Sequence, residues 1–256
     1  MREMLEVKHL TYEVTENGKP RRLVDDVSCS VGDGEMLVIT GPNGGGKSTI
    51  AKLLMGIERA DSGEILLDGR DLSGLNVNER AAAGLGYAFQ QPPAFKGMTV
   101  ERLLQLAAGR ELPEAVCCDL LSSVGICARE YLKREADATL SGGERKRIEI
   151  ATVLAKSHKI CIFDEPEAGI DLWSFSMLVK RFEGIHRTKQ ESLLLISHQE
   201  KIIRMADRIL IVDGGRIQDG GSREEMTAKL FQESCDCACM GGGKGDGGCE
   251  AGCGSR

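Results

Sequence analysis

One glycine-rich stretch constrains the fold more than any other part of the chain: Gly41-Pro42-Asn43-Gly44-Gly45-Gly46-Lys47-Ser48-Thr49. It fits the spacing Gly-x4-Gly-Lys-Ser/Thr, follows an apolar run typical of a buried parallel strand, and precedes a predicted helix that ends at Gly56. In this context backbone N–H groups turn toward phosphates and the helix N-terminus adds positive charge, whereas the alternative is a turn that binds nothing. We therefore predict a phosphate site in which Lys47 reaches the β- and γ-phosphates and Ser48 ligates Mg²⁺.

Composition excludes several classes of partner. The 256 residues carry a net charge of −6, which does not favour recognition of nucleic acid through its phosphates. No apolar run approaches the ~20 residues of a membrane span, so we expect no direct membrane insertion. The first residues lack a signal-peptide core, and we expect a cytoplasmic protein with reduced cysteines.

Apolar runs alternate with helical patterns and indicate an α/β fold. Residues 4–35 are expected to form antiparallel strands, with a hairpin at Asn17-Gly18. Further strands are predicted at 63–68, 86–90, 160–165 and 193–198, with a closing hairpin at 209–217. Residues 99–136 are mainly helical in pattern, and we interpret about 91–139 as a small helical insert.

Polar side chains follow three of the predicted strands. Asp164 and Glu165 end one strand, where Asp164 can hold Mg²⁺ through its water and Glu165 can orient or deprotonate an attacking water. Gln90 ends a second strand, and His198 lies just past a third. A histidine in that place is usually structural, although a strand end favours a functional role.

A serine and two glycines open the helix after the insert. Ser141 and Glu144 have the spacing of a capping box. A helix cap does not require the two glycines that follow, Gly142 and Gly143. Because they lack side chains, they leave the helix N-terminus bare enough to approach an anion.

The composition changes near the C-terminus. Residues 234–256 hold eight glycines and five cysteines, so we expect a Gly/Cys-rich flexible tail beyond a domain of residues 1–233. The spacing of the cysteines matches neither a zinc ribbon nor a ferredoxin run, and the alternatives are a soft-metal site and incidental cysteines in a solvated tail. The residues concerned are Cys235, Cys237, Cys239, Cys249 and Cys253.

In order along the chain, these motifs resemble those of the ATP-binding-cassette (ABC) ATPases. The resemblance covers residues 4–230 and is carried by Gly41–Thr49, Gln90, Leu-Ser-Gly-Gly-Glu (140–144), Ile-Cys-Ile-Phe-Asp-Glu (160–165), Ala-Gly-Ile-Asp (168–171) and His198. It implies a P-loop NTPase fold with a RecA-like core, an antiparallel β subdomain and a helical insert.

The resemblance also implies a Mg-dependent ATPase that closes as a head-to-tail homodimer around two ATP molecules. Ser141 and Gly143 would then contact the γ-phosphate held by the other subunit, and Asp171 would belong to the dimer-contact loop. Gln90 would sense Mg²⁺ and a partner, and His198 would hold the γ-phosphate. An adenine-stacking aromatic is expected where this chain has Val14, so Tyr12 on the same strand face is a candidate substitute.

Within that family, residues 164–175 look closest to the SufC-like ATPases of iron–sulfur cluster assembly, which implies a SufB- or SufD-like soluble scaffold as partner. Two alternatives remain. The first is the nucleotide-binding subunit of a membrane ABC transporter, which would carry the same catalytic motifs. The second is a metal-binding protein with a vestigial ATPase, which the intact catalytic positions disfavour.

Overall fold

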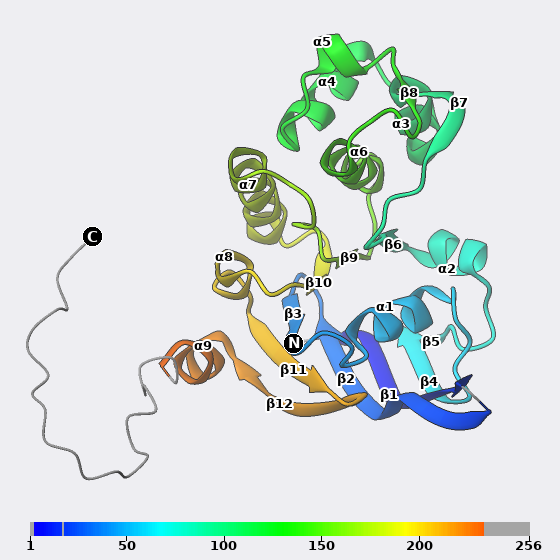
Figure 1. Ribbon diagram of the computed structural model, residues 1–256, viewed down its shortest axis with the longest axis vertical. Helices are drawn as coiled ribbons and strands as arrows, with labels where there is room; N and C mark the ends of the chain where they lie inside the picture. The colour runs from blue at the N-terminus through cyan, green and yellow to red at the C-terminus, as the bar shows by residue number, and fades with distance from the viewer. Residues whose placement is uncertain (1–2, 17, 233–256) are drawn as a thin grey trace, which may run out of the picture.

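The computed structural model describes residues 3–16 and 18–232. Figure 1 shows three parts one above another: an antiparallel sheet at the bottom, a mainly parallel sheet in the middle and a group of helices at the top. This is the α/β architecture with an antiparallel subdomain and a helical insert that the sequence predicts.

The central sheet has six strands in the order β12-β11-β3-β10-β9-β6. They are β3 (Met36–Thr40), β6 (Leu85–Ala88), β9 (Ile160–Asp164), β10 (Ser192–Ile196), β11 (Arg208–Asp213) and β12 (Arg216–Ser222). Every residue of β3, β9 and β10 is buried, which explains their almost continuous apolar sequences. Ile196 pairs in parallel with both Ile39 and Asp164, so the carboxyl ends of these three strands lie at one edge.

The antiparallel sheet has the order β2-β1-β4-β5 and supports the helix that follows the glycine loop. Its strands are β1 (Glu3–Glu16), β2 (Lys19–Gly32), β4 (Ser62–Leu67) and β5 (Arg70–Asp71). Helix α1 (Lys47–Met55) lies directly above these strands in Figure 1. Its Ile50, Leu53 and Leu54 belong to one apolar core with residues of both sheets. Gly56 ends α1 in a left-handed conformation, as predicted.

The helical part packs on a second apolar core. Its elements are α3 (Val100–Ala108), α4 (Glu114–Ser123), α5 (Ala128–Tyr131), α6 (Gly142–Leu154) and α7 (Leu172–Thr188). The helices α3, α4 and α5 lie within residues 99–136, where the sequence predicts a mainly helical pattern, and a two-stranded sheet of β7 (Phe95–Thr99) and β8 (Glu135–Ala136) closes the insert. The sequence does not predict this sheet, because Phe95 pairs with Ala136 far along the chain and local periodicity carries no information on such a pairing.

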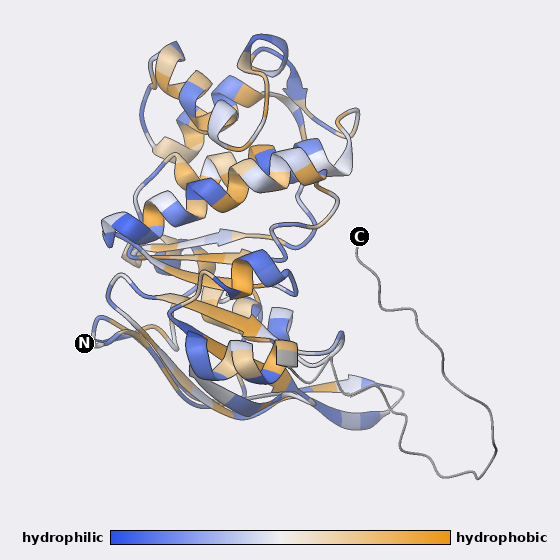
Figure 2. Ribbon diagram, turned by 90° about the vertical axis from the view of Figure 1, so that its left-hand side faces the viewer, coloured by the Kyte–Doolittle hydropathy of each residue, from blue (hydrophilic) through white to orange (hydrophobic). Residues whose placement is uncertain are grey.

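Three short helices complete the description: α2 (Val77–Ala83), α8 (Glu200–Ile203) and α9 (Arg223–Gln232). Figure 2 shows the apolar residues concentrated in the strands of the central sheet. Within residues 3–16 and 18–232, no helix is long and apolar enough to cross a membrane.

Candidate active site

The glycine loop joins β3 to α1 and needs glycine for steric reasons at two positions. Gly41 has φ +132°, and a Cβ there would lie 2.1 Å from the carbonyl oxygen of Val212. Gly46 has φ +100°, and its Cβ would lie 2.5 Å from the carbonyl oxygen of Leu23. The loop can therefore curl tightly against β11 and β2 only with these residues, which leaves its N–H groups available to an anion.

Lys47, the first residue of α1, is only 4 % exposed and lies inside this loop. Its Nζ donates hydrogen bonds of 2.8 Å to the carbonyl oxygens of Gly41 and Pro42. Burial lowers the pKa of Lys47, and the nearby carboxylates of Glu165 and Asp164 oppose that shift. The loop thus holds a cation among its own backbone groups, where it can bind phosphate oxygens.

Ser48 and Asp164 face each other across the ends of α1 and β9. The Ser48 hydroxyl donates a 2.9 Å hydrogen bond to Asp164 Oδ1, and the Tyr87 hydroxyl donates one of 3.3 Å to Oδ2. Burial raises the pKa of the fully buried Asp164 carboxyl. Tyr87, a residue that the sequence analysis missed, orients this carboxylate from β6.

These oxygen atoms fit a Mg²⁺ ion. Mg²⁺ takes hydroxyl, carboxylate and phosphate oxygens together with water, and rarely a cage made only of protein groups. Among the described residues, no cluster of three or more His, Cys, Asp or Glu could hold a metal by itself. Ser48 and Asp164, with the amide of Gln90 nearby, therefore fit a metal that arrives with a phosphate ligand.

Glu165, Gln90 and His198 lie together beside the loop. Gln90 Nε2 donates a 2.8 Å hydrogen bond to Glu165 Oε2, and His198 Nε2 lies 3.9 Å from Glu165 Oε1. Glu165 has φ +46°, unusual for a residue with a side chain, and its N–H donates to the carbonyl of Ile196. Such backbone strain is common at functional sites, and here it directs the carboxylate toward the cavity.

Glu167 is a second carboxylate beside the site, in addition to Glu165, and the sequence analysis missed it. Its Oε1 accepts hydrogen bonds from the Ser197 hydroxyl at 2.6 Å and from the His198 N–H at 3.3 Å. Burial raises the pKa of Glu167, and its Oε2 is buried without a hydrogen-bond partner among the residues that the structure describes. The loop after β9 therefore fixes the backbone of His198, a link that no spacing in the sequence reveals.

The cavity at the glycine loop has a volume of about 460 Å³, enough for a nucleotide's phosphates. It is lined by Arg21, Leu23, Asn43, Gly44, Gly45, Gly46, Lys47, Ser48, Thr49, Gln90, Glu165 and His198. Arg21 and Leu23 of β2 were not predicted. Tyr12, predicted as a substitute for an adenine-stacking residue, instead donates a 2.8 Å hydrogen bond to Glu58 and packs on the core. The side wall of the cavity is therefore formed by β2.

Ser141, Gly142, Gly143 and Asp171 are not among the residues that line this cavity. Ser141 and Glu144 form the predicted capping box at the start of α6. A Cβ on Gly143 would lie 2.3 Å from the carbonyl oxygen of Gly169, so this glycine allows α6 to approach the loop before α7. Asp171 caps α7 through the N–H groups of Trp173 and Ser174. The structure thus places the α6 N-terminus and the Asp171 loop together, apart from the glycine loop.

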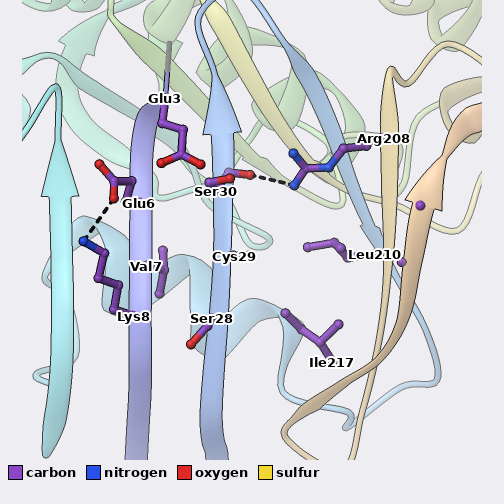
Figure 3. A pocket seen from close by; sticks show the side chains of 12 residues that line it. Glu3, Glu6, Val7, Lys8, Ser28, Cys29, Ser30, Arg208, Leu210 and Ile217 are labelled. Atoms are coloured by element: carbon purple, nitrogen blue, oxygen red, sulfur yellow. Dashed lines mark hydrogen bonds and ion pairs between the residues drawn. The ribbon is translucent and has the colours of Figure 1, made fainter. Parts of the chain in front are cut away.

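A second cavity, of about 560 Å³, lies between β1 and β2 on one side and β11 and β12 on the other (Figure 3). Its cations already have partners: Lys8 lies 3.1 Å from Glu6, and Arg208 donates to the carbonyl of Ser30. None of the predicted site residues lines it. The cavity at the glycine loop is therefore the candidate active site.

The five cysteines of the predicted tail metal site lie outside the described residues. Of the others, Cys117 and Cys161 are buried, and burial raises the pKa of both thiols. These two cysteines are therefore core residues rather than metal ligands or nucleophiles.

Comparisons with known proteins show what this chain is similar to. The model of the family described as "ABC transporter" matches residues 24–168. The chain is 35 % identical over 223 residues to the "Uncharacterized ABC transporter ATP-binding protein MJ0035" of Methanocaldococcus jannaschii, covering 84 % of this chain and 88 % of the relative. It is 34 % identical over 215 residues to the lipopolysaccharide export system ATP-binding protein LptB of Haemophilus influenzae, covering 81 % and 88 %.

A solved structure shares the fold. It is the dimeric post-hydrolysis state of the ATP-binding cassette MJ0796 bound to ADP and Pi, with a TM-score of 0.78 at 19 % identity. The match covers 86 % of this chain and 99 % of that one. At this identity the likeness supports the arrangement of sheets and helices described above, and nothing finer.

Proposed function

Since this chain belongs to the ABC transporter family of ATP-binding proteins, we propose that it binds Mg-ATP, hydrolyses it, and uses the cycle to move a partner protein. The observation that carries the proposal is the convergence of five side chains on one cavity, together with Asp164, which lies behind the wall and accepts a hydrogen bond from Ser48. They come from α1 and from the ends of β6, β9 and β10: Lys47, Ser48, Gln90, Asp164, Glu165 and His198.

Each residue has a role that follows from its position. Lys47 binds the β- and γ-phosphates together with the N–H groups of Gly41–Thr49. Glu165 accepts a proton from the attacking water, while Gln90 holds its carboxylate in place. His198, fixed through Glu167, donates to the γ-phosphate. Ser48 and Asp164 would hold Mg²⁺, which neutralises phosphate charge when bound.

We further propose that hydrolysis requires a head-to-tail dimer. Ser141 and Gly142 are exposed at a capped helix N-terminus yet do not line the chain's own cavity. A helix N-terminus suits an anion, and a second copy of the chain can supply that anion as the γ-phosphate in its glycine loop. The geometry thus supports a composite site, in which Asp171 lies beside the contact.

The partner is proposed to dock near Gln90 and the helical insert. Exposed apolar side chains gather in this part of the sequence and suit a protein contact. They are Phe89, Phe95, Leu106 and Val116. Phe89 directly precedes Gln90, so docking there can reach the catalytic residues.

Two kinds of partner are consistent with this surface. The name of LptB, an export-system protein, favours a membrane component of a transport system. The sequence of residues 164–175, which resembles the SufC-like ATPases, favours a SufB- or SufD-like scaffold in the cytoplasm that assembles iron–sulfur clusters. The transport reading has the support of the relatives, and the scaffold reading has that of this one segment.

The experiment that separates them is affinity purification of the tagged chain from its native cells, from the soluble fraction and from detergent-solubilised membranes in parallel. A membrane protein recovered in amounts equal to the chain supports the transport reading, and a soluble protein supports the scaffold reading. A Phe95→Glu/Leu106→Glu variant that recovers the same partner equally well would contradict the proposed docking surface. ATP turnover by the purified chain tests the proposal common to both readings.

A further inference from the structure

The side chains of Lys146 and Glu149 lie one helical turn apart on α6 and are almost completely buried. Lys146 is 0 % exposed and Glu149 is 7 % exposed. The Nζ of Lys146 lies 3.8 Å from Glu149 Oε2, an atom with no hydrogen-bond partner within the described part of the chain. A buried ion pair usually does little for stability, because desolvation offsets the attraction. Stability therefore does not explain why this ion pair is buried, and its contacts call for a functional explanation.

Both charged groups hold the backbone of a single residue, Phe89. Glu149 Oε1 accepts a 2.8 Å hydrogen bond from the Phe89 N–H, and Lys146 Nζ donates to the Phe89 carbonyl oxygen. The parallel pairing between β6 and β9 ends at Ala88 and Phe163, so Phe89 lies just beyond this ladder. The pair on α6 thus satisfies the backbone of the residue immediately before Gln90.

The same ammonium also reaches the other side of the site. Lys146 Nζ donates a 2.9 Å hydrogen bond to the carbonyl oxygen of Asp164, the residue before Glu165. One buried cation therefore fixes the backbone next to Gln90 and the backbone next to Glu165. These are the two residues whose side chains are joined by the 2.8 Å hydrogen bond beside the cavity.

We infer that Lys146 and Glu149 are positioning residues that hold Gln90 and Glu165 in register for hydrolysis and tie this geometry to the position of α6. The N-terminus of that helix carries Ser141, about a turn and a half before Lys146. Engagement of Ser141 by the nucleotide of a second copy then bears directly on the water-activating carboxylate. The inference rests on the proposed ATPase function and deepens it.

The test compares kcat and KM for Mg-ATP in a double variant, Lys146→Met/Glu149→Gln. This variant removes both charges together and keeps an oxygen that can accept from Phe89. We expect kcat to fall by about tenfold or more, as small displacements of catalytic groups do, with KM changed less than about twofold. Neither residue touches the cavity, so a loss of ATP affinity is not expected.

A double-mutant cycle with Gln90→Ala shows whether the pair acts through Gln90. If it does, kcat of the combined variant falls by about the same factor as in the more impaired of its two parent variants. It does not fall by the product of the two factors. Multiplicative losses would contradict the coupling. Unchanged kcat in the folded double variant, or a change confined to KM, would overturn the positioning role.

The matched control is Arg80→Met, which also removes a buried cation that donates to backbone carbonyls. Arg80 is 3 % exposed and holds the carbonyls of Leu53 and Leu54 at the far end of α1. It is expected to lower the unfolding midpoint without changing kcat of the folded enzyme.

Folding is checked for each variant by circular dichroism. Should the double variant not fold, Lys146→Gln, which keeps a donor, is measured in its place with the same expectation for kcat. If neither folds, the pair is a folding element and the inference is wrong. A wild-type chain without ATP turnover would instead overturn the proposed function itself.

Discussion

The side-chain amide of Gln90 donates a 2.8 Å hydrogen bond to the carboxylate of Glu165. The two residues follow β6 and β9, which are neighbouring parallel strands paired from Leu85–Ile160 to Ala88–Phe163. The residue nearest the proposed docking surface therefore touches the residue proposed to activate water. We therefore propose that a movement of the Gln90 segment changes the orientation of Glu165.

Lys47→Ala is expected to weaken ATP binding by about tenfold or more, because a hydrogen bond to a charged group contributes about 1.5–3 kcal/mol. Isothermal titration calorimetry measures the affinity. Lys52→Ala is the matched control, since Lys52 lies on the same helix but in its last turn. Equal affinities for the two variants would remove Lys47 from the site.

Ser141→Arg is expected to abolish turnover while leaving ATP binding to the isolated chain unchanged, because Ser141 does not line the chain's own cavity. Mixing this variant with Lys47→Ala should restore part of the activity. In the mixed dimer, one composite site combines an intact Lys47 with an intact Ser141. A mixture as inactive as its components would argue against a composite site.

Trp173, the single tryptophan of the chain, is 84 % exposed, and its backbone N–H donates to Asp171 Oδ1 at the start of α7. If the Asp171 loop lies at the dimer contact, ATP should shift the fluorescence emission of Trp173 to shorter wavelength in the Glu165→Gln variant, because the indole leaves water. The control adds the Ser141→Arg change, which should remove the shift. Unchanged emission in a dimer shown by sedimentation would place Trp173 outside the contact.

The sequence predicts most of this site because its chemistry is local. Gly41–Thr49 acts through one loop and its flanking strand and helix, and the capping box joins Ser141 to Glu144, only one helical turn away. Asp164, Glu165 and His198 could be grouped because apolar strands end in polar side chains at one edge of a parallel sheet.

Contacts between distant segments could not be predicted. Tyr87 reaches Asp164, and Glu167 reaches Ser197, only because β6, β9 and β10 are neighbours in the sheet. The order of these strands is a tertiary property without a local pattern. The same reason explains the unpredicted sheet of β7 and β8 and the cavity wall formed by Arg21 and Leu23.

Glu149→Gln is expected to flatten the dependence of stability on pH. Burial raises the pKa of Glu149 from its ordinary value of 4.5 to about 7. Between these values the folded chain holds a proton that the unfolded chain has lost, so stability falls as pH rises, by at most about 1.4 kcal/mol per pH unit for this group. The glutamine introduced in the variant does not titrate. The free energy of unfolding of the variant should therefore rise relative to that of the parent as the pH increases across this window.

Urea unfolding at pH 5, 6, 7 and 8 measures the difference in the free energy of unfolding between the two proteins. By the same linkage, this difference in free energy should grow from about pH 5 to about pH 7 and then level off. A constant difference at all four values would show that Glu149 does not titrate in this range.

We propose above all that two copies of this chain enclose ATP and that Glu165 carries out its hydrolysis. The most direct measurement is multi-angle light scattering of the Glu165→Gln variant with and without Mg-ATP, together with its rate of phosphate release. We predict a dimer that forms only with ATP, and turnover reduced to a small fraction of the parent's. A variant that stays monomeric with ATP and releases phosphate at the parent's rate would contradict both parts of the claim.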